Sequence, residues 1–193
     1  MRGKLAIVLA GTLLLGASGP ARAASGTHPK LAPGAIGYVD PGLQQIQDDA
    51  QAQIDSNPND PVAHVNMGNV YSDQGYYPQA ASEFQQALKL KGNDFKAHVS
   101  MAYAYYKQGD RDHSIEWFKK ALKINPKNAP TWASLAYVYE KNLEWKLAVQ
   151  TYQQYLRLAP NGDDAKLARY SIKLLQEKLK KYGEPKPYAI PPE

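Results

Sequence analysis

The sequence contains no cysteine among its 193 residues. A chain without thiols forms no disulfide, binds no metal through thiolates, offers no cysteine nucleophile and carries no c-type haem attached through cysteine. Lipidation on an N-terminal cysteine is excluded for the same reason. These absences remove thiol enzymes, c-type cytochromes and disulfide-stabilised scaffolds from consideration.

The residue patterns that carry catalysis are missing as well. We find no nucleophile with a base and an orienting residue, no paired carboxylates at motif spacing and no Gly-rich phosphate loop. The pairs Asp48-Asp49 and Asp163-Asp164 lie at or near expected helix starts, where carboxylates interact favourably with the helix dipole. The sequence therefore predicts a protein that is not an enzyme and has no cofactor.

Long hydrophobic runs are scarce, and the clearest one lies at the N-terminus. Arg2 and Lys4 precede an apolar run from Leu5 to Ala17, and Ala21-Arg22-Ala23 forms a small-x-small cleavage site. The run is shorter than the roughly 20 residues that a membrane-spanning helix needs. We predict that residues 1–23 are a secretory signal peptide, with an uncleaved anchor as the alternative. The expected location is the periplasm, with the extracellular space as the alternative, and no membrane span remains after cleavage.

The basic excess of the chain is small once this segment is set aside. The formal net charge is +5, from 23 basic and 18 acidic residues. Removing the three basic residues of the expected signal leaves 20 basic residues and a net charge of +2. A field this weak disfavours binding to nucleic acid.

The stretch from Pro61 to Gly162 carries one pattern three times, at a period of 34 residues. Small or apolar landmarks recur at equal offsets, and each unit ends on a helix breaker, namely Gly92, Pro126 and Pro160. Such a period indicates an array of equivalent structural units. The landmarks of the three units are Met67, Gly68, Tyr71, Gly75, Ala80, Phe84 and Ala87; Met101, Ala102, Tyr105, Gly109, Ser114, Phe118 and Ala121; and Leu135, Ala136, Tyr139, Leu143, Ala148, Tyr152 and Tyr155.

This pattern resembles the tetratricopeptide repeat family, which places Trp-x-x-Leu-Gly-x-x-Tyr in one helix and Ala-x-x-x-Phe-x-x-Ala in the next. Trp132 keeps the family's tryptophan, whereas His64 and His98 replace it in the other two units. Leu143 stands where a turn glycine is usual, and Tyr155 where a small alanine is usual. The resemblance covers about half of the chain, and it implies stacked helical hairpins without naming a ligand.

We therefore predict an all-α fold, an α-solenoid of three tetratricopeptide helix-turn-helix repeats over 61–94, 95–128 and 129–162. A helix over 43–58 corresponds to the second helix of a degenerate repeat, and a helix over 163–182 caps the other end. Asp60-Pro61 and similar cap residues mark the helix starts. Within the repeats we expect helices near 61–73, 78–91, 95–107, 111–124, 129–141 and 145–158.

The two ends of the chain have the composition of connecting segments. Residues 24–42 are rich in Gly, Pro, Ala and Ser, which favours a flexible linker. Residues 183–193 contain several prolines and are expected to be extended, either as an inert end or as a ligand for another module.

In solenoids of this family the first helices of successive repeats line a concave groove. The landmarks point into the stack, so other positions of the same helices, including Ala133 and Ser134, point into the groove. The ninth positions form a row of Asn69, Tyr103 and Tyr137. The candidate peptide-binding residues are Asn66, Asn69, Lys96, Val99, Tyr103, Tyr106, Lys107, Tyr137 and Lys141.

These residue types suit an extended peptide. Tyrosine offers a flat apolar face with a hydroxyl, and asparagine pairs with both the N–H and the C=O of an amide. We predict that the groove takes roughly six extended residues of an apolar or proline-containing segment. The alternative is that the tyrosines are ordinary surface aromatics of a chain with 14 tyrosines.

Some members of the family grip a terminal carboxylate through Lys at the fifth position and Asn at the ninth position of the first repeat. This chain has Val65 with Asn69, then Tyr103, then Ala133 with Tyr137. Only the asparagine remains, so we reject this carboxylate clamp.

The histidines do not form a metal site. His64 and His98 occupy the same place in adjacent repeats, which separates them by roughly one repeat spacing and is too far for one ion with N–metal distances near 2 Å. We expect both to pack half-buried in place of tryptophan. His28 and His113 are isolated.

The sequence thus predicts a non-catalytic scaffold or adaptor of the cell envelope that binds a protein or peptide partner. One alternative is an assembly or maturation factor for an envelope complex, such as secretin, pilus or cytochrome biogenesis. Another is a homo-oligomer that stacks head to tail, with Tyr155 and the terminal helix as the relevant surfaces.

Overall fold

The structure is a computed structural model that describes residues 41–185, and every regular element in that range is an α-helix. None of these helices is both long and apolar enough to cross a membrane. The predicted signal peptide, nearly all of the predicted linker and most of the Pro-rich tail lie outside the described residues. The helices are α1 (Pro41–Ser56), α2 (Pro61–Asp73), α3 (Tyr77–Leu90), α4 (Phe95–Gln108), α5 (Arg111–Ile124), α6 (Ala129–Lys141), α7 (Trp145–Leu158) and α8 (Ala165–Tyr182).

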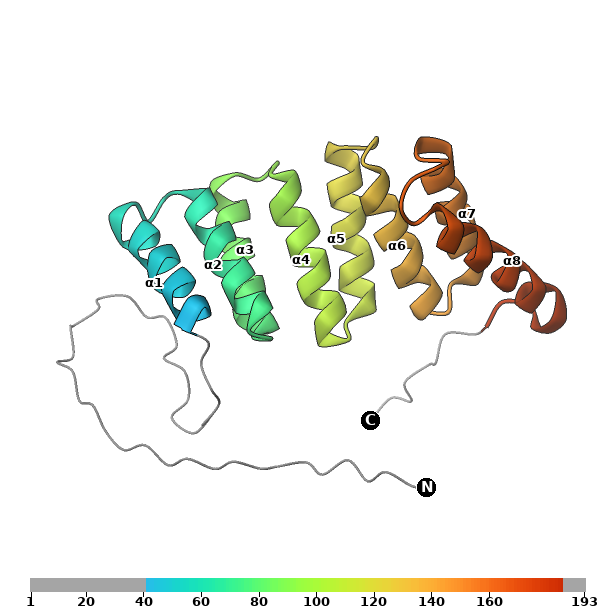
Figure 1. Cartoon of the computed structure of the whole chain (residues 1–193), viewed down its shortest axis with the longest axis horizontal. Coiled ribbons are helices and arrows are strands. Elements are labelled where there is room, and N and C mark those ends of the chain that lie inside the picture. The colour runs from blue at the N-terminus through green and yellow to red at the C-terminus, as the bar shows by residue number, and fades with distance from the viewer. Residues whose placement is uncertain (1–40, 186–193) are drawn as a thin grey trace, which may run out of the picture. The chain divides into compact units, whose positions relative to one another are not determined.

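The helices of this part follow one another in chain order, and each packs mainly against its neighbours (Figure 1). Three hairpins are formed by α2 with α3, α4 with α5, and α6 with α7, while α1 packs on α2 and α8 packs on α7. The all-α solenoid with three hairpins and a helix at each end is therefore confirmed. The six hairpin helices begin and end within one residue of the predicted positions, whereas α8 begins at Ala165 rather than residue 163.

Side-chain caps explain where several helices begin. The side chains of Asp60, Asp94, Asp110 and Asn128 each accept a hydrogen bond from a backbone N–H in the first turn of the next helix, at 2.9 to 3.1 Å. Such caps satisfy donors that have no partner inside the helix, and each contributes about 1 kcal/mol.

Each hairpin is held by an aromatic ring of its second helix packed against its first helix. Phe84 and Phe118 are fully buried, and Tyr152 occupies the equivalent place in the third hairpin. A Cβ atom added to Gly68 would lie 2.5 Å from the Phe84 ring. This contact explains why the first repeat has glycine at a position where the other two have alanine.

The two histidines that replace tryptophan pack in its place as predicted, but they are buried rather than half-buried. The indole Nε1–H of Trp132 donates to the carbonyl oxygen of Pro126 at 2.8 Å, and Nε2 of His64 lies 3.0 Å from the equivalent carbonyl of Pro58. His64 therefore keeps the tryptophan's link to the preceding turn. Its other ring nitrogen, Nδ1, lies 2.8 Å from the buried carboxylate of Glu83.

His98 instead packs its ring on Trp117, with ring centroids 5.5 Å apart. Within residues 41–185, no group of three or more His, Asp or Glu side chains is placed to hold a metal ion.

The turn inside the third hairpin contains a strained residue. Leu143 has φ 64°, in the left-handed region that the turn glycines Gly75 (φ 81°) and Gly109 (φ 88°) occupy in the other two hairpins. A side chain in this conformation costs roughly 1–2 kcal/mol. Leu143 is exposed, so burial of its side chain offsets little of that cost.

We expect Leu143→Gly to raise the free energy of unfolding by about 1 kcal/mol, because relief of the left-handed strain exceeds the added entropy of the unfolded chain. Urea unfolding followed by circular dichroism measures the change. As the matched control, Gly109→Ala should lower stability by a similar amount. A Leu143→Gly protein less stable than the parent would contradict this explanation of the turn.

Candidate functional site

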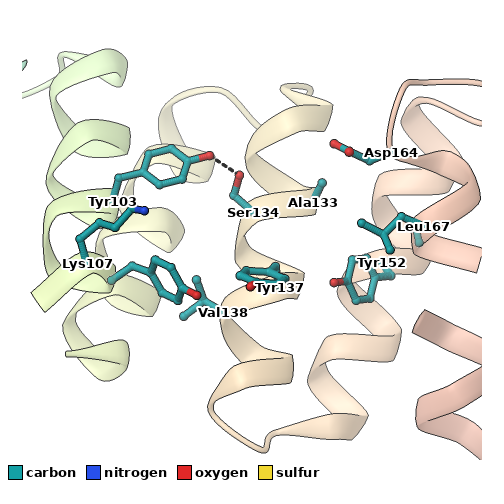
Figure 2. Close-up of a pocket in the computed structure, with 11 residues that line it drawn as sticks. Tyr103, Lys107, Ala133, Ser134, Tyr137, Val138, Tyr152, Asp164 and Leu167 are labelled. Carbon is teal, nitrogen blue, oxygen red and sulfur yellow. Dashed lines mark hydrogen bonds between the residues drawn. The ribbon is translucent and has the colours of Figure 1, made fainter. Parts of the chain in front are cut away.

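A cavity of about 420 Å³ lies where α4, α6, α7 and the start of α8 meet (Figure 2). Its volume falls in the range of sites that bind small molecules or short peptide segments. Four tyrosines contribute to its walls, and we call it the tyrosine cavity. It is lined by Tyr103, Tyr106, Lys107, Ala133, Ser134, Tyr137, Val138, Tyr152, Asp164, Leu167 and Ala168.

Tyr103 and Tyr137 face this cavity from neighbouring first helices, and 45% and 40% of their surfaces remain exposed. The Tyr103 hydroxyl lies 2.5 Å from Oγ of Ser134, and that Oγ donates to the carbonyl oxygen of Pro130 at 3.0 Å. The Tyr103 ring also meets the buried Phe118 edge-on, at 5.2 Å between centroids. These contacts fix the ring between α4 and α6 (Figure 2), and its exposed part lines the cavity.

The other tyrosines of the cavity are held as neutral phenols. The Tyr106 and Tyr137 rings meet edge to face at 5.8 Å, and the hydrogen bond with Tyr137 raises the pKa of Tyr106, with burial as the second cause. Burial also raises the pKa of Tyr152, helped by the charge of Glu140, whose Oε2 accepts the Tyr152 O–H at 3.1 Å. Both hydroxyls therefore stay protonated at physiological pH.

Two charged side chains line the tyrosine cavity, and they have opposite signs. Lys107 comes from α4, and Asp164 comes from the turn before α8, on the far side of the cavity (Figure 2). An ammonium group donates hydrogen bonds and a carboxylate accepts them, so the pair matches the C=O and N–H groups of a peptide backbone. The balanced charge does not favour a strongly acidic or basic ligand.

The predicted groove residues divide into two groups. Tyr103, Tyr106, Lys107 and Tyr137 line the cavity, together with the groove positions Ala133 and Ser134. The remaining candidates, Asn66, Asn69, Lys96, Val99 and Lys141, do not line it.

Contacts with neighbouring side chains explain why several of these residues do not line the cavity. The Asn66 amide donates to Oε1 of Gln53 in α1 at 2.9 Å, and Val99 packs partly buried against the core. Nζ of Lys141 lies 5.0 Å from the centroid of the Tyr137 ring, on the margin of the cavity.

Five lining residues were not anticipated: Val138, Tyr152, Asp164, Leu167 and Ala168. Tyr152 occupies the landmark of Phe84 and Phe118, which assigned it to the core. Its polar hydroxyl, absent from both phenylalanines, was the available signal that one edge of this ring reaches a cavity. The α8 residues carried no comparable signal, because their placement depends on a turn that breaks the repeat.

Tyr155 creates that turn. It occupies the position of Ala87 and Ala121, is only 3% exposed, and its hydroxyl accepts the backbone N–H of Asp164 at 3.1 Å. A Cβ atom at Gly162 would lie 2.6 Å from this hydroxyl, so the turn requires glycine there. Tyr155 thereby positions Asp164 at the cavity.

The prediction that Tyr155 forms a surface for self-association is wrong, because the ring is buried.

We expect Tyr155→Phe to lower the free energy of unfolding by about 1 kcal/mol, because the N–H of Asp164 loses its protein acceptor. Hydrogen exchange at the Asp164 amide should accelerate in the same variant. Tyr170→Phe is the matched control, since the exposed Tyr170 side chain has no hydroxyl contact of this kind to lose. Equal exchange rates for the Asp164 amide in parent and variant would disprove the role of this hydrogen bond.

Comparison with known proteins agrees with the helical hairpins. Descriptions of the tetratricopeptide repeat match residues 95–128 and 117–150, and a TPR repeat description matches residues 68–109. No curated protein sequence matches the chain.

Solved structures show the same fold at low sequence identity. A crystal structure of MamA is 17% identical with a TM-score of 0.60, covering 75% of this chain and 97% of MamA. A MamA RS-1 ArsTM double mutant is 18% identical with a TM-score of 0.60, covering 72% of this chain and 86% of that one. The first TPR of Spaghetti (RPAP3), bound to the HSP90 peptide SRMEEVD, is 17% identical with a TM-score of 0.57, covering 62% and 93%.

Repeats of this kind typically serve as non-catalytic modules for protein–protein interaction. The family matches fall on consecutive repeats, and the helical hairpins stack as in the similar structures. The chain therefore belongs to the tetratricopeptide repeat family and is a protein–protein interaction module.

Proposed function

We propose that this module binds an extended, apolar or proline-containing segment of a partner protein in the tyrosine cavity. The observation that carries the proposal is the cavity itself, in which four tyrosines from three helices surround an open space. The similar structure of Spaghetti, which holds a peptide, supports a peptide as the kind of ligand.

The chemistry of the walls favours a neutral segment. Aromatic faces pack well against prolyl rings and aliphatic side chains, and grooves lined by aromatics are a recurrent binding mode for polyproline II segments. Tyrosine hydroxyls and Lys107 can donate to backbone carbonyls, while Asp164 can accept from backbone N–H groups. Ordering a free peptide opposes binding, so we expect dissociation constants of about micromolar size.

The same walls disfavour acidic peptides such as the SRMEEVD bound to Spaghetti. Lys107 is the one cation that lines the tyrosine cavity in the described part of the chain, and Asp164 on the opposite side repels carboxylates. Ligand preference should therefore follow proline and aliphatic content rather than negative charge.

An array of ten-residue synthetic peptides tests this preference directly. We expect binding to peptides rich in proline and aliphatic residues, and little binding to SRMEEVD. Tyr137→Ala should weaken binding of the selected peptides about tenfold, because it removes an aromatic wall whose contacts contribute roughly 1.4 kcal/mol. Tyr182→Ala is the control, since Tyr182 is exposed but lies outside the cavity. Equal binding by the Tyr137→Ala and Tyr182→Ala variants would reject the cavity as the site.

We further propose that the protein acts as an adaptor in the cell envelope after export. The support is the N-terminal sequence, in which basic residues, an apolar run and a small-x-small site come one after another over residues 1–23.

We expect the periplasmic fraction of an expressing bacterium to contain a mature form that begins at Ala24. Intact-mass measurement and N-terminal sequencing check this, and a cytoplasmic protein that retains Met1 would contradict it.

A further inference from the structure

We propose that copies of this protein associate head to tail, with α8 of one copy against α1 of the next. The two terminal helices carry opposite charge. α1 contains Asp48, Asp49 and Asp55 and no basic residue. α8 contains one acidic residue, Glu177, and six basic residues: Lys166, Arg169, Lys173, Lys178, Lys180 and Lys181.

The exposed side of α1 corresponds to a surface that is covered inside the repeats. By the 34-residue period, α1 is the second helix of a hairpin whose first helix does not exist among the described residues. Ile46 corresponds to Ala80, which is fully buried, yet Ile46 is 54% exposed. Asp49 corresponds to the buried Glu83 and is also exposed. An apolar side chain and a carboxylate thus remain on a face that the fold normally buries.

α8 has the complementary place, because by the 34-residue period it stands where a first helix would, and no second helix follows it within residues 41–185. It packs on α7 through Ala165, Ala168, Ser171 and Leu175, and this contact leaves another face free. On that face Tyr170 is 65% exposed, and Lys166 and Lys173 are exposed beside it.

Joining α8 to α1 of a second copy would complete one hairpin from two chains. Joined in this way, Lys166 and Lys173 of α8 would face Asp48 and Asp49 of α1 in the next copy. Tyr170 and Ile46 would supply the apolar contact. Opposite charges guide the two copies together and fix the register of such a contact. Contacts of α1 with α1, or of α8 with α8, would instead bring like charges together.

The contact uses different surfaces on the two copies, so it does not close on itself as a twofold dimer does. Repeated association therefore builds an open chain. The proposed contact uses Lys166, Tyr170 and Lys173 of α8, none of which lines the tyrosine cavity, so each copy in the chain keeps its own cavity.

Charge-reversal variants of the purified protein test this proposal. One variant carries Asp48→Lys and Asp49→Lys on α1, and the other carries Lys166→Glu and Lys173→Glu on α8. We expect the parent to gain mass with concentration in sedimentation velocity and to lose association at high salt. Each variant alone should dissociate at least about tenfold more readily, because like charges then meet at the junction. A Lys123→Glu, Lys127→Glu variant changes exposed charges elsewhere by the same amount and should behave as the parent.

Mixing the two charge-reversal variants gives the decisive result. In the α1 variant the residues of the junction are basic on both α1 and α8. In the α8 variant they are acidic on both helices. An equimolar mixture should therefore associate even though neither variant does, and circular dichroism establishes that both variants are folded. The proposal is overturned if the parent remains monomeric at its highest soluble concentration in low salt. It is also overturned if the variants associate as the parent does, or if their mixture stays monomeric.

Discussion

The whole array depends on one contact, the packing of an aromatic ring from the second helix of each hairpin against a small residue of the first. Phe84 packs against Gly68, and Phe118 and Tyr152 occupy the same place further along. Because this contact turns the landmark face of each first helix into the stack, the opposite face is left for the groove. Tyr103 and Tyr137 are available to a ligand for this reason.

The tyrosine cavity forms where the repeat is interrupted rather than where it is most regular. A tyrosine at the alanine position, Tyr155, occupies space that the next hairpin would use, and it binds the backbone of Asp164. The guanidinium of Arg169 donates to the carbonyl of Pro160 at 2.6 Å and secures the same turn. As a result, α8 turns an unusual face toward α7 and closes one end of the groove.

Features that arise from periodicity and helix caps could be predicted from the sequence, whereas most of those that arise from interruption of the repeat could not. The period placed the hairpin helices within one residue and put Tyr103 and Tyr137 on one side, because equivalent positions in equivalent units share an environment. It could not indicate that Gln53 of α1 binds Asn66, since α1 belongs to an incomplete repeat. Nor could it place Asp164, whose position depends on the buried Tyr155 hydroxyl.

Trp117 links the two halves of the core, since it packs partly buried against the residue cluster of the first hairpin and also against that of the third. In repeat arrays stability is a sum of intrinsic and nearest-neighbour terms, so a side chain shared between neighbours sets how strongly they are coupled. The indole of Trp117 therefore couples the two halves of the core. Fraying that begins at either end has to break the indole's contacts before it can pass to the other half.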